Sequence, residues 1–450
     1  MKFKERVATT FLFMAILGIF GMSFIVGRGL ETKVSAETDG YEELKVFTEV
    51  LSALQKNYVE PVDNKDLVYG AIKGMLNTLD AHSTFMPAEI YKEMQVDTKG
   101  EFGGLGLQIG IKENKLVVVA PIEGTPAEEA GIKAGDIILK VDDTVFTEET
   151  SLLDAVSKMR GPKGTEVVLT VQRDSVPDPI VFPLIRDVIR IRSVKSEVLE
   201  PGIGYIRITQ FQEKTATDLR KAISKLRDTN MHSLILDLRN NPGGLLNSAV
   251  EVSEQFMDSG KLIVTIKSRD GKKDEYISGK ASTLGEIPLI VLVNEGSASA
   301  SEIVSGALQD WGRAVVVGTQ TFGKGSVQTI LPLSDGSALR LTTAKYYTPK
   351  GRSIQNLGID PDIIVAPATV REAANRPIIR EKDLERHLEN EMQPDLKDEP
   401  ISIPPTEETL QPGVASSKTE EDHQLKKAVD LLKSWRIFKG VDPRLSVKKE

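Results

Sequence analysis

The chain has 450 residues, enough for two or three domains, and its net charge of −8 disfavours nucleic acid as a partner. It contains no cysteine, which excludes thiol catalysis, disulfide bonds and cysteine–zinc sites. Apolar residues make up 40% of the sequence, an ordinary share for a protein that buries a core.

The N-terminus carries a segment typical of export. Basic residues precede an apolar run over residues 7–27, which is long enough to cross a bilayer as a helix, since about 20 residues are needed. The positive flank predicts that its N-terminal side stays in the cytoplasm. Small residues at 34–36 are compatible with cleavage, so residues 1–36 are predicted to be a signal peptide or a membrane anchor. We therefore expect an exported protein, in the periplasm or at the outer face of the cytoplasmic membrane, and membrane association through this segment.

Residues 37–95 are predicted to form a helical N-terminal region. Leu44, Phe47 and Leu54 recur at helical spacing, and a second apolar stripe follows over residues 67–79. The stretch from Asp80 to Ser83 is expected to be a turn between helices. Apolar stripes of this kind usually form a core or a contact between copies of a chain, so they suggest self-association.

Residues 96–185 change to short β-rich runs. A helix is expected to begin at Thr125, with Thr as N-cap and Pro126 at the first helical position, and a second one runs from about Ser151 to Met159. A small domain of five strands and two helices is predicted. Its strands are expected at 105–111, 116–120, 137–141, 166–172 and 180–184.

Residues 186–370 alternate strands and helices, which is the α/β pattern. Runs of Val, Ile and Leu at 234–238, 289–293 and 314–317 indicate strands buried on both faces. Helices are expected at 215–229, 246–258 and 301–310. The predicted fold class is thus multidomain α+β and α/β.

Residues 371–450 form the last predicted region. From 392 to 422 the chain is rich in Pro, Glu and Ser, which indicates a linker. An amphipathic helix is expected over 425–435.

Ser299 is a candidate nucleophile. It follows the strand predicted at 289–293 and opens a helix, and ligands of open α/β sheets bind at the carboxyl ends of strands. Free N–H groups and positive potential at a helix N-terminus suit an oxyanion. On sequence grounds Ser297 or Ser301 could also be the nucleophile. The alternative is a capping box, in which Ser299 caps the helix and Glu302 reaches back.

Lys324 is the candidate base. Glycines on both sides free its backbone to approach another segment. A lysine base must be neutral, and since its reference pKa is about 10.4, the amine has to be desolvated in an apolar pocket. In an extended stretch Lys324, Ser326 and Gln328 share one face, so that Gln328 can hold the lysine in position. The alternative is a solvated loop lysine.

A third string, over residues 236–244, also leaves a buried strand and enters a helix. Gly243 and Gly244 can present a backbone N–H to an oxyanion, although a plain turn would have the same sequence. Together the three strings place a nucleophile, a base and N–H donors at strand ends of one domain.

These strings resemble the motifs of the carboxyl-terminal processing peptidases, the tail-specific protease family. The resemblance covers roughly residues 41–370, beyond which it fades. It implies Ser299 as nucleophile, Lys324 as general base and Gln328 as its orienter. The matching stretches are 297–302, 322–328 and 237–244.

The resemblance also implies an oxyanion hole built from the N–H of Ala300 and of a glycine in the pair Gly243 and Gly244. It implies a homodimer, and it requires no metal and no organic cofactor.

The β-rich domain resembles a PDZ domain. The backbone N–H groups of its glycine-rich loop can capture a C-terminal carboxylate, while the peptide adds as a strand beside the sheet. That chemistry selects protein ends with apolar residues, and the alternative is a glycine-rich hairpin in an inert domain. The expected binding residues are Gly104, Leu105, Gly106 and Leu107 in the loop, with Leu152 and Val156 on the second helix.

Arg160 ends that second helix. We hypothesise a regulatory role, in which it carries a signal from the PDZ domain to the core through a hydrogen bond or an ion pair. The alternative is a surface arginine that interacts favourably with the helix C-terminus.

The sequence therefore predicts a serine endopeptidase that cleaves near the C-termini of exported proteins. Its partners would be proteins or peptides with free apolar C-termini, and the sequence leaves room for an adaptor protein. The alternative is a non-catalytic envelope scaffold or chaperone that binds tails through the PDZ domain. A Ser-His-Asp hydrolase is less favoured because the four histidines lie in no motif, and a metalloprotease less still because no His-Glu-x-x-His string occurs.

Overall fold

The computed structural model describes residues 39–147, 150–174, 176–279, 282, 284–367, 379–392 and 422–440. The predicted signal peptide or anchor and most of the predicted linker lie outside these residues. Within the described part of the chain, no helix combines the length and the apolar character that crossing a membrane requires. The chain divides after Gly74 into two compact units.

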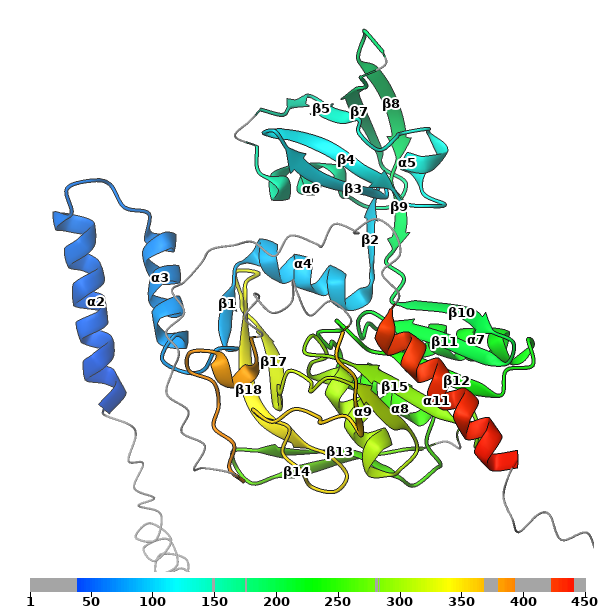
Figure 1. Cartoon of the computed structure of the whole chain (residues 1–450). Coiled ribbons are helices and arrows are strands. Elements are labelled where there is room, and N and C mark those ends of the chain that lie inside the picture. The colour runs from blue at the N-terminus through cyan, green and yellow to red at the C-terminus, as the bar shows by residue number, and fades with distance from the viewer. Residues whose placement is uncertain are drawn as a thin grey trace, which may run out of the picture. The chain divides into compact units, whose positions relative to one another are not determined.

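The first unit contains α2 (Asp39–Asn57) and most of α3 (Asn64–Leu76), as the helical prediction for this region expected (Figure 1). Large apolar side chains of α2 face solvent: Leu44, Phe47 and Leu54 are 62%, 43% and 40% exposed. The apolar stripe of α2 is therefore left largely uncovered.

The centre of the second unit is a six-stranded sheet with the order β10-β11-β12-β15-β16-β19. Only the β10–β11 pair of this sheet is antiparallel, and the other neighbours are parallel. The strands are β10 (Val194–Glu200), β11 (Ile203–Ile208), β12 (Ser233–Asp237), β15 (Leu289–Val293), β16 (Val315–Gly318) and β19 (Ile363–Ile364).

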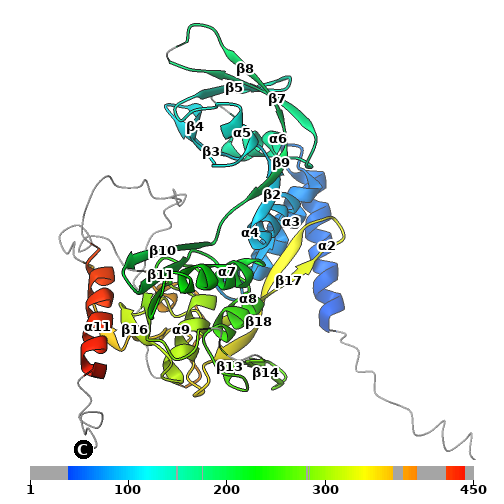
Figure 2. The same cartoon turned by 90° about the vertical axis from the view of Figure 1, so that its right-hand side faces the viewer.

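Helices cover both faces of this sheet (Figure 2). Leu234 and Leu236 of β12 pack in one cluster with α7 (Thr215–Arg227), α8 (Leu246–Glu254) and α9 (Ala300–Asp310). Ile235 points to the other face and joins a cluster with α11 (His423–Gly440). Because side chains alternate along a strand, β12 buries all of its residues, which confirms the prediction of strands buried on both faces.

A second, antiparallel sheet lies in the same unit and was not predicted. Its strand β18 pairs with β1, β13 and β17. Residues 80–83 form the expected turn, but it leads from α3 into the strand β1 rather than directly into a helix, so that part of the expectation was wrong. The elements are β1 (Thr84–Met86), β13 (Leu262–Ser268), β14 (Lys273–Ile277), β17 (Ser326–Pro332) and β18 (Ala338–Tyr347), and α4 (Ala88–Lys99) follows β1.

The small domain has the predicted arrangement with one additional strand. Its sheet has the order β3-β4-β5-β7-β8, and β6 pairs with β5. Thr125 is the N-cap of its first helix but makes no side-chain capping hydrogen bond, and its hydroxyl donates to the carbonyl oxygen of Ile122 at 2.5 Å. The elements are β3 (Leu107–Lys112), β4 (Lys115–Pro121), α5 (Pro126–Glu129), β5 (Ile137–Val141), β6 (Thr144–Val145), α6 (Leu152–Met159), β7 (Glu166–Gln172) and β8 (Ile180–Ile185).

Two paired strands connect this domain to the rest of the unit. The chain enters through β2 (Glu101–Gly104) and returns through β9 (Asp187–Arg190), and the two strands run antiparallel. The structure thus joins a helical N-terminal region, a PDZ-like domain and an α/β core, as the predicted fold class required.

The buried β12 gives a test of the fold. Leu236→Ala is expected to lower the free energy of unfolding by about 2–5 kcal/mol, because a fully buried side chain is lost and leaves a cavity. Val315→Ala on β16 is the control; its side chain is 40% exposed, so a loss under about 1 kcal/mol is expected. Urea unfolding followed by tryptophan fluorescence measures both. Equal losses would contradict the packing described.

Candidate active site

Ser299 lies where β15 has ended and α9 begins. Its backbone has φ 55° and ψ −111°, a conformation that costs on the order of 1–3 kcal/mol for a residue with a side chain. Its N–H donates to Oε2 of Glu302 at 2.7 Å. The serine is therefore held in a strained turn at a helix N-terminus, as nucleophiles of hydrolases often are.

The hydroxyls of the two neighbouring serines are hydrogen-bonded to backbone carbonyl oxygens. The hydroxyl of Ser297 donates to the carbonyl oxygen of Leu238 at 2.8 Å, and that of Ser301 donates to the carbonyl oxygen of Asn241 at 2.9 Å. Both side chains are fully buried, whereas Ser299 is half-buried. Of the three candidates, Ser299 is the one that a substrate can reach.

Glu302 joins the serine turn to the lysine loop. Besides the N–H of Ser299, its carboxylate accepts from the hydroxyl of Thr321 at 2.6 Å and from the N–H groups of Gly323 at 2.7 Å and Lys324 at 3.0 Å. Burial raises the pKa of Glu302 to about 7, and these hydrogen bonds lower it in part. The capping-box pattern indicated the contact to Ser299, but nothing in the sequence indicated the contacts across the loop.

The side chain of Lys324 lies among charged groups. Burial and the charge of Arg340 lower the pKa of its amine, while the carboxylates of Glu381, Asp80 and Glu302 raise it, and the net direction is downward. Among the described residues no hydrogen bond joins this amine to the Ser299 hydroxyl. The surroundings of Lys324 thus lower the pKa of its amine, as a neutral base requires.

Tyr346 of β18 is a neighbour of the site that sequence reasoning missed. Its hydroxyl donates to the carbonyl oxygen of Lys324, and its N–H donates to the carbonyl oxygen of Gly325 at 2.9 Å. Burial raises the pKa of Tyr346 well above its usual range, and a hydrogen bond with the Ser299 side chain lowers it in part. A neutral phenol therefore stands between the serine and the lysine loop.

Gln328 of β17 presents an open acceptor. Its Nε2 donates to the hydroxyls of Thr342 at 2.8 Å and Ser326 at 3.3 Å. Its Oε1 is buried and has no hydrogen-bond partner in the described part of the chain. A buried acceptor of this kind is costly unless a donor reaches it at some stage of the function.

The two glycines of the third motif contact the serine turn and its surroundings. Gly243 has φ 104°, and a Cβ there would lie 2.9 Å from Cβ of Ser299 and 3.0 Å from the N of Ala300. Gly244 has φ 139°, and a Cβ there would lie 2.2 Å from the carbonyl oxygen of Phe211. Both positions therefore require glycine. The N–H of Gly243 donates to Oδ1 of Asn241 at 2.9 Å rather than toward the serine.

The same motif is tied to the C-terminal helix. Arg239 binds the buried carboxylate of Asp237 at 2.6 Å and that of Asp422, directly before α11, at 2.7 Å. The hydroxyl of Tyr205 donates to Asp237 at 2.8 Å. The described end of the chain thus anchors the loop that carries the two glycines.

The PDZ-like domain has a small cavity of about 90 Å³ between its glycine-rich loop and α6. Five of the six predicted binding residues line it, and Leu152 does not, because it stands at the first turn of α6 and is 39% exposed. Met159 occupies the wall instead. The cavity is lined by Phe102, Gly104, Leu105, Gly106, Leu107, Ile109, Val156, Met159 and Arg160.

Arg160 links this cavity to α4. Its guanidinium binds both carboxylate oxygens of Glu93 at 2.6 Å and lies over the ring of Phe102, 4.5 Å from the centroid. Its Nε is buried without a hydrogen-bond partner among the described residues. The side chain is thus a contact between the domain and its surroundings rather than a free surface arginine.

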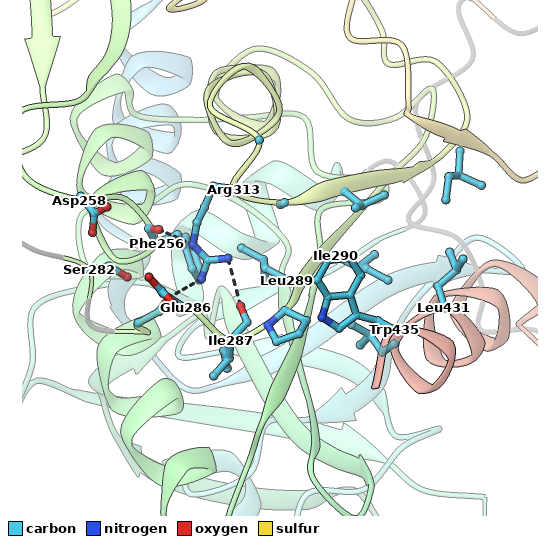
Figure 3. Close-up of a pocket in the computed structure, with 17 residues that line it drawn as sticks. Phe256, Asp258, Ser282, Glu286, Ile287, Leu289, Ile290, Arg313, Leu431 and Trp435 are labelled. Carbon is cyan, nitrogen blue, oxygen red and sulfur yellow. Dashed lines mark hydrogen bonds between the residues drawn. The ribbon is translucent and has the colours of Figure 1, made fainter. Parts of the chain in front are cut away.

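A larger cavity of about 570 Å³ lies elsewhere in the core (Figure 3). It is lined by Leu289 at the start of β15 and by Trp435 of α11, so it is at the opposite end of β15 from Ser299. The guanidinium of Arg313 beside it donates to the carbonyl oxygens of Phe256 at 2.8 Å and Ile287 at 3.2 Å. This cavity is mainly apolar, although Asp258, Glu286 and Arg313 also line it, and it lies apart from the candidate active site.

The rings of two described histidines bind groups other than Ser299. His82 binds Glu381 at 2.7 Å, and the ring of His387 contacts the carbonyl oxygen of Leu384 at 3.0 Å. Across the ranges that the structure describes, no group of three or more His, Asp or Glu residues is arranged to hold a metal ion.

Three family descriptions match the chain. "Peptidase family S41" matches residues 202–365, "PDZ domain" matches 117–173, and "Activating protease CtpB N-terminal domain" matches 19–90. Together with the serine at the start of α9, they define the class as a serine-type peptidase with a PDZ domain.

Curated relatives extend the match over most of the chain. The carboxy-terminal-processing protease of Bartonella bacilliformis is 43% identical over 389 residues, which cover 84% of this chain and 88% of that protein. The carboxy-terminal processing protease CtpA of Bacillus subtilis is 36% identical over 364 residues, covering 81% and 78%. The chain belongs to peptidase family S41, among the carboxy-terminal processing proteases. The family resemblance drawn from the motifs is thereby confirmed.

One solved structure also resembles this chain. The photosystem II D1 C-terminal processing protease has 32% sequence identity and a TM-score of 0.43, covering 72% of this chain and 93% of that one.

The contacts of Glu302 give a prediction for activity. Glu302→Gln places an amide NH₂ against N–H donors, so at least one contact to the serine turn or the lysine loop is lost. We expect kcat for peptide cleavage to fall on the order of 100-fold, since each lost buried hydrogen bond costs about 1–3 kcal/mol. Glu295→Gln is the matched control, because Glu295 lies in the same turn but accepts from Thr319 at 3.1 Å. Similar kcat values for the two variants would contradict the role of Glu302.

Proposed function

We propose that this chain is a serine endopeptidase with a Ser-Lys dyad that binds and cleaves near the C-termini of exported proteins. The observation that carries this proposal is the Glu302 carboxylate, which accepts the N–H of Ser299 at 2.7 Å and the N–H of Lys324 at 3.0 Å. One buried group therefore keeps the nucleophile turn and the lysine loop together.

In this mechanism the neutral amine of Lys324 takes the proton of the Ser299 hydroxyl as the oxygen attacks the substrate carbonyl carbon. The resulting tetrahedral intermediate expels the amine of the peptide bond, which takes the proton from the Lys324 ammonium. The acyl group is then on Ser299. A water molecule then gives a proton to Lys324 as its oxygen attacks the ester carbonyl carbon. The Ser299 oxygen leaves with that proton, which restores both the serine and the neutral amine.

The oxyanion of the intermediate is assigned to backbone N–H groups at the start of α9. Ala300 is the first residue of α9, where the N–H has no acceptor within the helix and the helix dipole is positive. Gly243 or Gly244 supplies the second donor. Because the N–H of Gly243 is donated to Asn241, the use of Gly243 requires this N–H to turn toward the substrate.

Gln328 is assigned to hold the lysine. Its buried and unpartnered Oε1 is an acceptor that suits an N–H of the Lys324 amine, and the lysine precedes β17 by two residues. An oriented amine keeps its lone pair toward the serine.

The PDZ domain is assigned to the substrate tail. The N–H groups of the loop over residues 104–107 bind the terminal carboxylate, and the peptide lies along β3 as an added strand. The apolar cavity of about 90 Å³ has room for the side chain of the last residue. Arg160 lines this cavity and binds Glu93 of α4. It is the proposed regulatory contact, which couples binding of the tail to the protease core.

The exposed apolar stripe of α2 supports a homodimer as a further part of the proposal. Leu44, Phe47 and Leu54 are the side chains that a second copy would cover. Export, membrane association through the N-terminal segment and an adaptor protein remain expectations from the sequence.

The dyad is tested by activity against pH. Ser299→Ala and Lys324→Arg are expected to abolish cleavage of an unstructured protein at every pH. The first variant lacks the nucleophile, and the second carries an arginine that stays charged and cannot act as a base. For the wild type, kcat/KM should rise with pH as Lys324 loses its proton and level off above a pKa that burial has lowered. Lys273→Ala, on the exposed end of β14, is the control. Degradation by Ser299→Ala at the wild-type rate would favour the scaffold interpretation and remove the serine from the mechanism.

Tail recognition is tested with a substrate that ends in a carboxylate and one that ends in an amide. The amide should be cleaved about tenfold less efficiently, because charge-assisted hydrogen bonds to the loop are lost. Val156→Asp, in the cavity wall, should lower cleavage of the carboxylate substrate, and Ser157→Asp, on the exposed side of α6, should not. Equal rates for both substrates would contradict the assignment of the loop.

A further inference from the structure

The carboxylate of Asp80 binds a donor from another part of the chain. Asp80 is 6% exposed and lies in the turn before β1. It accepts from the N–H of His82 at 2.8 Å and from the N–H and hydroxyl of Ser83 at 3.0 and 2.7 Å. These contacts belong to its own turn, but a fourth donor, the hydroxyl of Thr342 on β18, lies 3.0 Å away.

The direction of the hydrogen bond between Thr342 and Gln328 follows from which groups carry a proton. Burial raises the pKa of Asp80, but its hydrogen bonds lower it further, so the group is a carboxylate that can only accept. The hydroxyl proton of Thr342 therefore goes to Asp80. The oxygen of Thr342 is left to accept, and it takes the N–H of Gln328 Nε2 at 2.8 Å.

This chain of bonds decides which way the amide of Gln328 faces. Because Thr342 has no proton left for the amide, the NH₂ end of Gln328 must point to it, and the oxygen must point away. The oxygen is the buried Oε1 that has no partner among the described residues. An amide turned the other way would present N–H donors to the lone pair of the neutral amine, which the proposed base needs for the proton of Ser299.

We propose that Asp80 and Thr342 are positioning residues, which fix the amide of Gln328 so that its oxygen is open to the amine of Lys324. This proposal rests on the proposed function, in which Lys324 is the base. It adds two residues from outside the motifs, one of which lies ahead of the PDZ domain in the sequence.

The fold itself does not need the Thr342 hydroxyl. Strand β1 pairs with β18 at Thr84, Phe85 and Met86, and the N–H of Thr342 separately donates to the hydroxyl of Ser83 at 3.1 Å. These contacts join the two segments whether or not residue 342 carries a hydroxyl. The bonds from Asp80 to Thr342 and from Thr342 to Gln328 are therefore best explained by the orientation of Gln328.

A substitution at Thr342 tests the proposal more specifically than one at Asp80. The charge of Asp80 acts directly on Lys324, together with those of Arg340, Glu381 and Glu302, so that removing it alters the lysine by a second route. Thr342→Val removes the hydroxyl with little change in shape, and Thr342→Ser keeps it. Thr343 gives a matched control, since it is exposed and its hydroxyl bonds to that of Thr329 at 2.6 Å.

The test measures kcat and KM for peptide cleavage. Thr342→Val is expected to lower kcat about tenfold with little change in KM, since one orienting hydrogen bond is lost. Thr342→Ser should restore kcat, and Thr343→Val should match the wild type. In a Gln328→Ala background, Thr342→Val should cause no further loss, because Thr342 acts through Gln328.

Two results would overturn the proposal. One is wild-type kcat for Thr342→Val, and the other is an equal loss of kcat in the wild-type and Gln328→Ala backgrounds, which a general structural effect produces. Lys324→Ala is measured in parallel. If Lys324→Ala keeps full activity, the proposed function fails, whereas an inactive Lys324→Ala beside a fully active Thr342→Val removes only the orienting role. Thermal unfolding of each variant shows that it is folded.

Discussion

The buried carboxylate of Glu302 is the contact on which the candidate active site depends. It accepts the N–H of Ser299, whose backbone conformation is unfavourable by itself, and the N–H groups of Gly323 and Lys324. Without this acceptor, donors on both loops would be buried and unpaired, and no hydrogen bond to Glu302 would stabilise the strained turn at Ser299. Burial is unfavourable for the carboxylate and raises its pKa, and the hydroxyl of Thr321 is a fourth donor that offsets this cost together with the three N–H groups.

The site combines segments that are far apart in the sequence. The parallel sheet supplies the strained turn of Ser299 and the glycine motif, because both follow the carboxyl ends of its strands. The antiparallel sheet supplies the other half: β17 and β18 carry Gln328, Thr342 and Tyr346, and β1 brings Asp80 beside them. The lysine loop connects β16 of the first sheet to β17 of the second. The role proposed for Glu302 and the role proposed for Asp80 are thus similar, since each buried carboxylate fixes one side of Lys324.

Much of the fold and part of the site could be predicted from the sequence. Apolar runs predicted β5, β7 and β15 to the residue. The family motifs singled out Ser299, Lys324 and the glycine pair as candidates, and their roles stay predictions. β1 and β6 have too few residues for a periodic pattern, and they form because β18 and β5 lie beside them. Local sequence did not distinguish Ser299 from Ser297 and Ser301, since the distinction lies in the carbonyl oxygens of a distant loop. Tyr346 and Asp80 join the site by strand pairing, which single-sequence patterns do not record.

The central claim is that Lys324 activates the hydroxyl of Ser299. Labelling with a serine-reactive fluorophosphonate, followed by mass spectrometry of the digested protein, tests it most directly. We expect one adduct, on Ser299, that forms faster as the pH rises and is lost in Lys324→Ala. An adduct on Ser297 or Ser301, or labelling of Ser299 at the same rate without the lysine, would contradict the claim.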